Sequence, residues 1–442
     1  MPVRKTTQER PMVRANSGSR QPSTDWLSGR LVSAGRMGGD SQASQGRKKP
    51  DTSRTVLSTA SAMRSGDDWR RDLLKSEDSP HNAAMTASAR PLMALDLSVL
   101  EAPYPSGVER QARQLFQELP KALPEFEIVG LARRPIQDQG HEVGRVVVAG
   151  GAWPRPVWRR RMLPTLCARL GVAHLHTPVT SLPARLLGFA SRCVHDIPWA
   201  RGGSAGDERR NILRELWLTR ELAKPFPTVC VSEATARDFK TVVPEFKAPV
   251  ETIGNGVADM FFERPPSRPL PAVPSDFVLV VGKFRPRRRP GVLARAARRL
   301  ADETGVGIVW VGEGTESLRE GPLWGLGPVS DEVLRALLAE ARALVAPSDQ
   351  EGFGIPVLEA MAAGRPVISA VCEGVRAWAG DRVLEYPAED AQALAARIRD
   401  VVMDPPPSAV LDRNRSFARS HTWSRVAESY AEFFRRIVSS RR

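Results

Sequence analysis

The chain has 442 residues, of which 42% are hydrophobic and 26% are charged, a composition typical of folded proteins with about two domains. No run approaches the ~18 uncharged apolar residues of a membrane-spanning helix, and the first 20 residues lack the apolar core of a secretion signal. The cysteines are scattered without a paired spacing, which favours reduced thiols in the cytoplasm over a disulfide framework or a zinc site. They are Cys167, Cys193, Cys230 and Cys372.

The net charge of +14 is spread unevenly along the chain. Residues 1–90 hold 16 Lys and Arg against 9 Asp and Glu, so about one fifth of the chain carries half of the excess. The remaining residues are only mildly basic, which suits contact with phosphates or acidic lipids. We therefore expect no nucleic-acid partner.

Residues 1–90 are rich in Ser, Arg, Gly, Thr and Gln and show no sustained periodicity. Such a segment buries too little apolar surface to offset its ordering entropy. We predict a disordered basic extension with a short helix at Asp67–Lys75. Met93 opens the first predicted strand, so a start of translation at Met93 is an open alternative.

Residues 91–263 alternate between short apolar runs and segments with apolar residues at helical spacing. This alternation predicts a parallel sheet flanked by helices, a Rossmann-like domain. The predicted strands are Ala94–Val99, Glu127–Leu131, Ala173–His176, Arg192–His195 and Thr228–Ser232. The predicted helices are Val108–Leu119, Arg209–Leu222 and Glu233–Lys240.

A linker at 264–275 separates this domain from a second one, because the segment 263–275 has five prolines in thirteen residues. The alternation then resumes over 276–422, and 423–442 ends the chain with a helix at Trp423–Val438. The second domain's predicted strands are Phe277–Gly282, Gly307–Gly312, Ala343–Ala346 and Pro366–Ala370. Its predicted helices are Pro290–Glu303, Asp331–Ala341 and Val357–Ala363. Two such domains leave a cleft at the carboxyl ends of their strands, where ligands bind.

The segment 343–364 predicts a strand, a glycine-containing loop and a helix that begins near Pro356 and ends at Gly364. The free N–H groups of the loop and the positive end of the helix form an anion-binding site. Glu351 in the loop and Glu359 in the first helical turn both face the cleft. Their carboxylates suit the hydroxyl groups of a ribose and a sugar. The alternative is that Glu359 only complements the helix dipole and that the glycines only shape a turn.

The run Glu351-Gly-Phe-Gly-Ile-Pro-Val-Leu-Glu359-Ala-Met-Ala-Ala-Gly364 resembles the Glu-x7-Glu motif of the retaining glycosyltransferases of family 4. The likeness extends along most of residues 93–440. It implies a GT-B fold and metal-independent transfer from a nucleoside-diphosphate sugar, with no cofactor. By this resemblance Glu359 binds the donor ribose and Glu351 contacts the transferred sugar. Backbone N–H groups of Gly352, Phe353 and Gly354 would hold the sugar and the diphosphate.

A second element, Gly282-Lys-Phe-Arg-Pro-Arg-Arg-Arg289, resembles the family's Gly-x-x-x-Pro-Arg-Lys loop, whose basic residue neutralises the donor diphosphate. Arg288 stands where Lys is usual, and Lys283 stands where Arg, Thr or Ser often stands. A cation here would stabilise the charge that builds on the leaving diphosphate, with Arg offering a fixed fork. The alternative is a solvated basic loop.

The same resemblance assigns Gly312 to a turn beside the nucleotide and Val329 to the neighbourhood of the nucleobase. In the first domain, Gly107 follows a strand and precedes a helix, so that its N–H can approach a phosphate or a sugar. His195 and Asp196 resemble a His-Asp pair that faces the transferred sugar or the acceptor. A structural role for His195 remains an equal alternative, and two further histidines, His174 and His176, are assigned to structural or acceptor-side positions.

One departure from the family is Val371-Cys-Glu-Gly-Val-Arg-Ala-Trp378, which lacks the usual Pro-Glu pair and makes the acceptor side harder to infer. The basic loop most resembles that of mannosyltransferases, so GDP-mannose is the favoured donor and a saccharide or lipid-linked saccharide the expected acceptor. We assign catalytic roles to Glu351, His195 and Arg288.

We expect a cytoplasmic protein and leave peripheral contact with the inner face of the membrane open, through Arg155–Arg161 with Trp153 and Trp158. Two other functions stay open. One is a catalytically silent GT-B scaffold, and the other is a nucleic-acid-binding or membrane-binding protein led by its basic tail.

Overall fold

The structure is a computed structural model that describes residues 90–101, 106–136, 144–202, 211–266 and 270–440. These residues lie within one compact unit, Ala84–Arg442. The predicted extension 1–90, apart from Arg90, and the expected helix Asp67–Lys75 fall outside the described residues.

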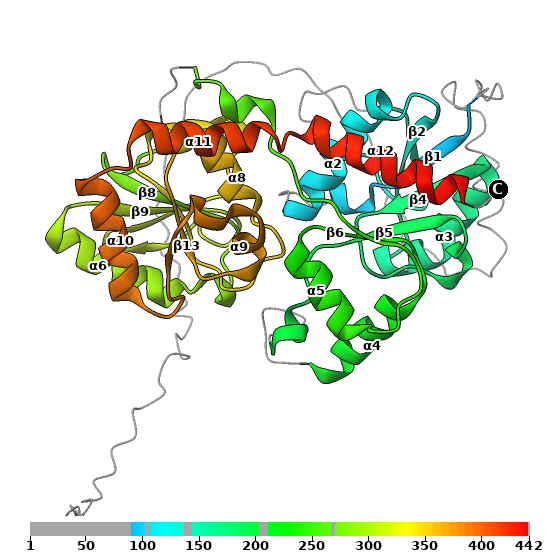
Figure 1. Ribbon diagram of the computed structural model, residues 1–442, viewed down its shortest axis with the longest axis horizontal. Coiled ribbons are helices and arrows are strands. Elements are labelled where there is room, and N and C mark those ends of the chain that lie inside the picture. The colour runs from blue at the N-terminus through cyan, green and yellow to red at the C-terminus, as the bar shows by residue number, and fades with distance from the viewer. Residues whose placement is uncertain (1–89, 102–105, 137–143, 203–210, 267–269, 441–442) are drawn as a thin grey trace, which may run out of the picture. The chain divides into compact units, whose positions relative to one another are not determined.

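The first domain is built on a sheet whose seven described strands run parallel in the order β3-β2-β1-β4-β5-β6-β7 (Figure 1). The strands are β1 (Leu92–Asp96), β2 (Glu127–Ala132), β3 (Val146–Val148), β4 (Val172–Thr177), β5 (Ala190–Val194), β6 (Thr228–Cys230) and β7 (Val250–Thr252). The helices are α2 (Gly107–Ala122), α3 (Arg155–Leu170), α4 (Ile212–Ala223) and α5 (Glu233–Val242). Short 3-10 helices are η2 (Ser98–Glu101), η3 (Ala184–Leu186), η4 (Pro198–Arg201) and η5 (Asp259–Phe262).

The second domain has a sheet with the order β10-β11-β9-β8-β12-β13-β14 among the described strands, in which only β10 is antiparallel to its neighbour. The strands are β8 (Phe277–Val281), β9 (Gly307–Val311), β10 (Arg319–Glu320), β11 (Leu323–Gly327), β12 (Leu344–Ala346), β13 (Val367–Ala370) and β14 (Leu384–Tyr386). The helices are α6 (Pro290–Glu303), α7 (Asp331–Glu340), α8 (Ile355–Ala362), α9 (Glu373–Ala379), α10 (Ala391–Met403), α11 (Ser408–Arg419) and α12 (Trp423–Ser439). Two 3-10 helices are η6 (Pro286–Arg288) and η7 (Gly380–Arg382).

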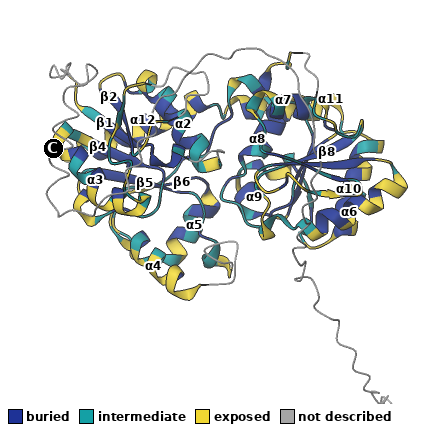
Figure 2. Ribbon diagram, turned by 180° about the vertical axis from the view of Figure 1, so that it is seen from behind, coloured by how far each residue is buried: buried dark blue, intermediate teal, exposed yellow. Residues whose placement is uncertain are grey.

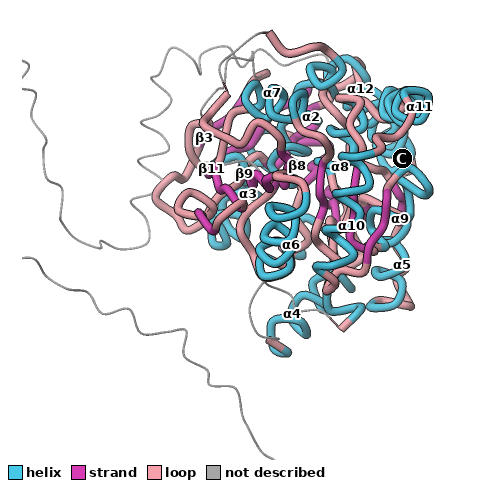
Figure 3. Tube along the Cα trace, turned by 90° about the vertical axis from the view of Figure 1, so that its left-hand side faces the viewer, coloured by secondary structure: helices cyan, strands magenta, loops and turns pink. Residues whose placement is uncertain are grey.

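Helices flank both sheets, and the strands form the buried interior of each domain (Figures 2 and 3). Central strands such as β5 and β9 are buried along their whole length, as expected for parallel sheets covered on both faces. The predicted alternation of strands and helices is therefore confirmed, with one Rossmann-like sheet in each domain.

Every strand and helix predicted within the described residues is present, with small shifts at the ends. The first strand ends earlier than predicted, at Asp96, because the Asp96 carboxylate turns the chain into η2. Its Oδ1 accepts hydrogen bonds from the N–H and the hydroxyl of Ser98, at 3.0 and 2.6 Å. Such side-chain bonds to a residue two positions on are typical of turns.

Helix α3 was not predicted, and it corrects the suggestion that Trp158 contributes to a membrane-facing surface. Trp158 is fully buried, and its indole N–H donates to the carbonyl of Ala149 at 2.6 Å. Arg159 on the same helix pairs with the buried Asp96 at 2.9 Å. Trp158 and Arg159 of this segment therefore pack and pair inside the first domain and do not face a membrane surface.

The predicted terminal helix is confirmed as α12, and it packs along α2 of the first domain (Figure 1). Apolar side chains at helical spacing form its buried face, including Trp423, Val426, Tyr430 and Phe434. Tyr430 lies edge-on to the ring of His176 on β4, at 5.3 Å between ring centroids. The last helix therefore joins the first domain after the chain has built the second.

Candidate donor site

The predicted donor loop, residues 347–354 between β12 and α8, has the predicted form. Gly354 precedes the helix with φ of 85°, a left-handed conformation that favours glycine, and Pro356 lies in the first turn. Gly364 follows the helix with φ of 69°, as expected of a C-terminal glycine. Because α8 begins at Ile355 rather than Val357, Glu359 lies in the second turn and not, as predicted, in the first.

A cavity of about 800 Å³ opens at this loop and is lined by residues of both domains. All of the predicted site residues reach its wall. They are Gly107, His195, Asp196, Gly282, Lys283, Arg288, Gly312, Val329, Glu351, Gly352, Phe353, Gly354 and Glu359. The structure thus brings together every residue that the sequence assigned to the site, while their individual roles stay predictions.

Glu351 lies beside Arg288, with 3.3 Å between Oε1 and Nη2. Burial alone would raise the pKa of Glu351, but the guanidinium groups of Arg288 and Arg287 more than offset it, and the pKa is lowered. This carboxylate therefore stays ionised against a positive wall of the cavity.

The segment that departs from the family pattern packs directly beneath Glu351. Its helix, α9, begins at Glu373, and Gly374 lies so close that a Cβ there would be 1.7 Å from the Glu351 carbonyl oxygen. The segment that lacks the Pro-Glu pair thus packs closely against the loop between β12 and α8 through Gly374.

Glu359 pairs with an arginine that the sequence did not single out. Arg110, on α2 of the first domain, donates from Nη1 to Glu359 Oε1 at 2.9 Å and from Nη2 to Asp331 Oδ1 at 2.5 Å. Burial raises the pKa of Glu359, and Arg110 opposes this rise while Asp331 adds to it. The net result is a carboxyl group whose pKa is raised. No local pattern signals Arg110, because its partners are far away in sequence.

Arg288 depends on a glycine for its position in the basic loop. Gly282 has φ of 132°, and a Cβ there would lie 2.3 Å from the guanidinium carbon of Arg288. Glycine therefore lets this side chain lie flat against the end of β8.

Two other cations of the loop, Lys283 and Arg287, are also paired with acids. Lys283 pairs with Glu313 at 2.6 Å. Arg287 reaches Asp196 of the first domain at 3.2 Å, so that Asp196 meets the basic loop across the cavity. The loop is thus a set of positioned charges rather than a freely solvated segment.

On the first-domain side, α2 starts at Gly107 and points its N-terminal end at the cavity, with the Ser106 and Glu109 side chains forming a capping box. His195 follows β5, and its Nε2 lies 3.2 Å from the carbonyl oxygen of Pro178, which fixes the ring through a backbone contact.

The two other histidines are buried away from the cavity wall. His174 and His176 both contact the hydroxyl of Ser191, at 2.8 and 2.9 Å. Burial lowers the pKa of His176 to about 3, so this ring is neutral. Of the two predicted positions, structural and acceptor-side, the burial of both rings fits the structural one.

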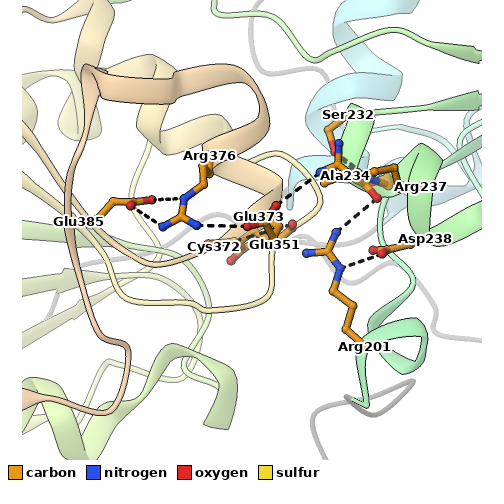
Figure 4. A network of polar contacts seen from close by, with 11 residues as sticks. Arg201, Ser232, Ala234, Arg237, Asp238, Glu351, Cys372, Glu373, Arg376 and Glu385 are labelled. Atoms are coloured by element: carbon orange, nitrogen blue, oxygen red, sulfur yellow. Dashed lines mark hydrogen bonds and ion pairs between the residues drawn. The ribbon is translucent and has the colours of Figure 1, made fainter.

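A chain of ion pairs runs from α5 to α9 (Figure 4). Arg237 on α5 lies 3.4 Å from Glu373, which also contacts Arg376 at 3.3 Å, and Arg376 reaches Glu385 at 2.6 Å. Arg237, Glu373 and Arg376 have exposed side chains and Glu385 is half-buried, so each pair contributes on the order of 0–1 kcal/mol. These ion pairs link α5 of the first domain to α9 of the second.

The protein-family model described as "Glycosyl transferases group 1" matches residues 275–404, the part of the chain that carries the donor loop. Residues 275–404 are therefore similar to the group 1 glycosyl transferases. The group 1 domain thus contains Glu351, Glu359 and the basic loop, and the first domain supplies the opposite wall.

Two curated relatives are similar in sequence to part of the chain. The O-antigen chain mannosyltransferase B of Escherichia coli is 34% identical over 29% of this chain and 37% of its own length. A D-inositol 3-phosphate glycosyltransferase of Saccharomonospora viridis is 29% identical over 43% of this chain and 51% of its own length. The chain thus matches about half or less of these relatives.

The solved structure of sucrose-phosphate synthase from Thermosynechococcus elongatus aligns with 79% of this chain and 100% of its own. The TM-score is 0.64 at 20% sequence identity, which supports the shared GT-B fold around the group 1 domain.

Neither a metal cluster nor a spanning helix is present in the described residues. No group of three or more His, Cys, Asp or Glu side chains in this part of the chain is placed to hold a metal ion. None of the described helices is both long and apolar enough to cross a membrane.

Proposed function

We propose that the chain is a retaining glycosyltransferase that moves a hexose, in the first instance mannose, from a nucleoside-diphosphate sugar to an acceptor hydroxyl. GDP-mannose is the favoured donor, and the acceptor is a saccharide or lipid-linked saccharide of surface polysaccharide or glycoconjugate synthesis. The observation that carries this proposal is the meeting of Glu351, Arg288, Glu359 and the start of α8 on one cavity.

The donor diphosphate binds where positive charge converges. The N–H groups of Gly352–Gly354 and the start of α8 supply partial positive charge, and Arg288 and Lys283 supply full charges on the same wall. Negative charge builds on the diphosphate as the bond to the sugar breaks. Because these N–H groups and side chains already point at the diphosphate, they lower the activation barrier of transfer without having to reorganise. This arrangement needs no metal ion and no cofactor.

The two carboxylates hold the rest of the donor. Glu359 accepts hydrogen bonds from the ribose hydroxyls, and the ionised Glu351 accepts from a hydroxyl of the transferred sugar. Gly312 and Val329 lie on the same cavity wall, beside the nucleoside. The glutamate pair therefore orients the anomeric carbon toward the first domain.

The acceptor enters from the side of Gly107, His195 and Asp196. In a front-face reaction, the acceptor oxygen bonds to the anomeric carbon as the carbon–phosphate oxygen bond breaks, and the departing phosphate oxygen takes the acceptor proton. Configuration is retained because attack and departure occur on the same face. The protein contributes positioning, electrostatic stabilisation and exclusion of water.

A screen for nucleotide release tests the proposal. Full-length protein is incubated with UDP-, GDP- and dTDP-sugars and an acceptor extract, with Glu359→Gln as the control. We expect GDP release from GDP-mannose, an α-linked product by NMR and a strong loss in the variant. Absence of turnover with every donor would favour a silent GT-B scaffold, and a β-linked product would exclude retention.

A further inference from the structure

We propose that Arg110 is a donor-positioning residue that acts through Glu359 from the opposite domain. This inference rests on the proposed function, in which Glu359 binds the donor ribose. It adds a residue of the first domain to a donor site that otherwise belongs to the group 1 domain.

One guanidinium bridges two acids of the second domain. Arg110 reaches Glu359 on α8 at 2.9 Å and Asp331 at the start of α7 at 2.5 Å. The Glu359 side chain is only 3% exposed, and that of Arg110 is 22% exposed. Both residues line the cavity, so the pair lies where a bound nucleoside would meet it.

The bridge fixes the carboxylate and favours its ionised, hydrogen-bond-accepting form. A carboxylate has about four acceptor positions, so the single contact with Arg110 leaves positions for a pair of ribose hydroxyls. Asp331 brings a second negative charge close to Glu359, and burial disfavours ionisation further. Arg110 is the cation that opposes both effects.

Arg110 is held in place by its neighbour on α2. Gln111 is fully buried, and its Nε2 donates to Asn255 Oδ1 at 2.9 Å and to the Tyr430 hydroxyl at 3.3 Å. These contacts set the rotation of the helix about its axis, and Arg110 consequently points at α8. Ribose binding thereby depends on the first domain as well as on the second.

A purely structural ion pair between the domains would make a different prediction. Such a pair would affect every nucleotide alike, since it would change only the closure of the cleft. A positioning role through Glu359 affects only the ligands that carry ribose hydroxyls. The ribose 2′- and 3′-hydroxyls therefore separate the two roles.

The test compares GDP with 2′,3′-dideoxy-GDP by calorimetric titration of the full chain. We expect Arg110→Gln to weaken GDP binding about tenfold or more, as for the loss of a hydrogen bond between charged groups, and to leave dideoxy-GDP binding nearly unchanged. Arg110→Lys should recover part of the GDP affinity, because it keeps the charge but not the two-armed bridge. Arg113→Gln, the same change one turn further along α2, is the matched control and should bind as the wild type does.

The outcomes are distinct. Equal losses for both nucleotides, or no loss for either, overturn the positioning role and leave the proposed function standing. If the wild type binds none of GDP, UDP, ADP and dTDP, the proposed function fails and this inference fails with it. If UDP proves to be the nucleotide that binds, UDP and 2′,3′-dideoxy-UDP replace the GDP pair. Should Arg110→Gln not fold, the same comparison is made with Arg110→Lys, for which a selective loss of GDP affinity is again required.

Discussion

The carbonyl oxygen of His195 lies against Gly352, so closely that a Cβ on Gly352 would be 1.6 Å from it. The chain just after β5 in the first domain therefore touches the donor loop of the second through its backbone. This contact places His195 beside the glycines that we assign to the sugar and the diphosphate.

Replacing Gly352 by alanine tests whether this approach matters. A methyl group cannot fit against a carbonyl oxygen at that distance, so the donor loop or the end of β5 must move. We expect Gly352→Ala to destabilise the fold by about 1–3 kcal/mol and to lower kcat/KM for the donor sharply, as measured by thermal melting and by nucleotide release.

Gly291→Ala is the control for that change, because Gly291 lies within α6 and nothing closer than 3.5 Å would meet its Cβ. Helix propensity predicts that this variant is slightly more stable than the wild type. Full activity in Gly352→Ala would show that the two domains do not meet in this way during the reaction.

Arg288 offers a test of the charge assigned to the departing diphosphate. Because the interaction strengthens in the transition state, Arg288→Ala should lower kcat about 10²- to 10³-fold, with a smaller effect on donor binding. Arg288→Lys should retain part of the rate, since the family usually has Lys at this position. Arg299→Ala, an exposed arginine of α6, should behave as the wild type, and an unimpaired Arg288→Ala would refute the role.

The sequence was informative where local chemistry decides the structure. The loop from Glu351 to Gly354 and the start of α8 follow from two glycines and Pro356, which limit the backbone to few conformations. The strands and helices of the second domain were predicted from the spacing of apolar residues along the chain. Each of these predictions needed only residues that are neighbours along the chain.

Long-range pairings could not be predicted in this way. Arg110 and Glu359 are 249 positions apart. The sequence around Arg110 does not show which acidic residue it pairs with in the folded protein. Arg287 and Asp196 likewise form a pair only once both domains are folded. Helix α3 was missed because Pro164 and a run of arginines obscure its apolar face, although Trp158 and Leu163 on that face are fully buried.

Removal of metal ions provides a third test of the proposed chemistry. If Arg288, Lys283 and the start of α8 supply the positive charge for the diphosphate, a chelator should leave the rate unchanged. We expect equal initial rates of nucleotide release with EDTA and with added Mg²⁺ or Mn²⁺. A rate that is lost in EDTA and restored by a divalent ion would assign this charge to a metal instead.

The pH dependence of donor binding should report on Glu359. Ribose binding needs the carboxylate form, and the pKa of Glu359 is raised by burial and by Asp331. Donor affinity should therefore fall as the pH drops through this raised pKa, at a higher pH than for an ordinary glutamate. Glu351 does not account for this loss, because its pKa is lowered and it stays ionised over the same range.

Measuring the donor KM at a series of pH values in two variants shows whether Glu359 or another titrating group controls donor binding. Glu359→Gln should bind the donor weakly at every pH, so its KM should not rise further at low pH, as that of the wild type does on this acid limb of the profile. Asp331→Asn removes the negative charge that raises the pKa of Glu359, so its acid limb should move to lower pH. An acid limb that stays in place in both variants would show that another group controls donor binding.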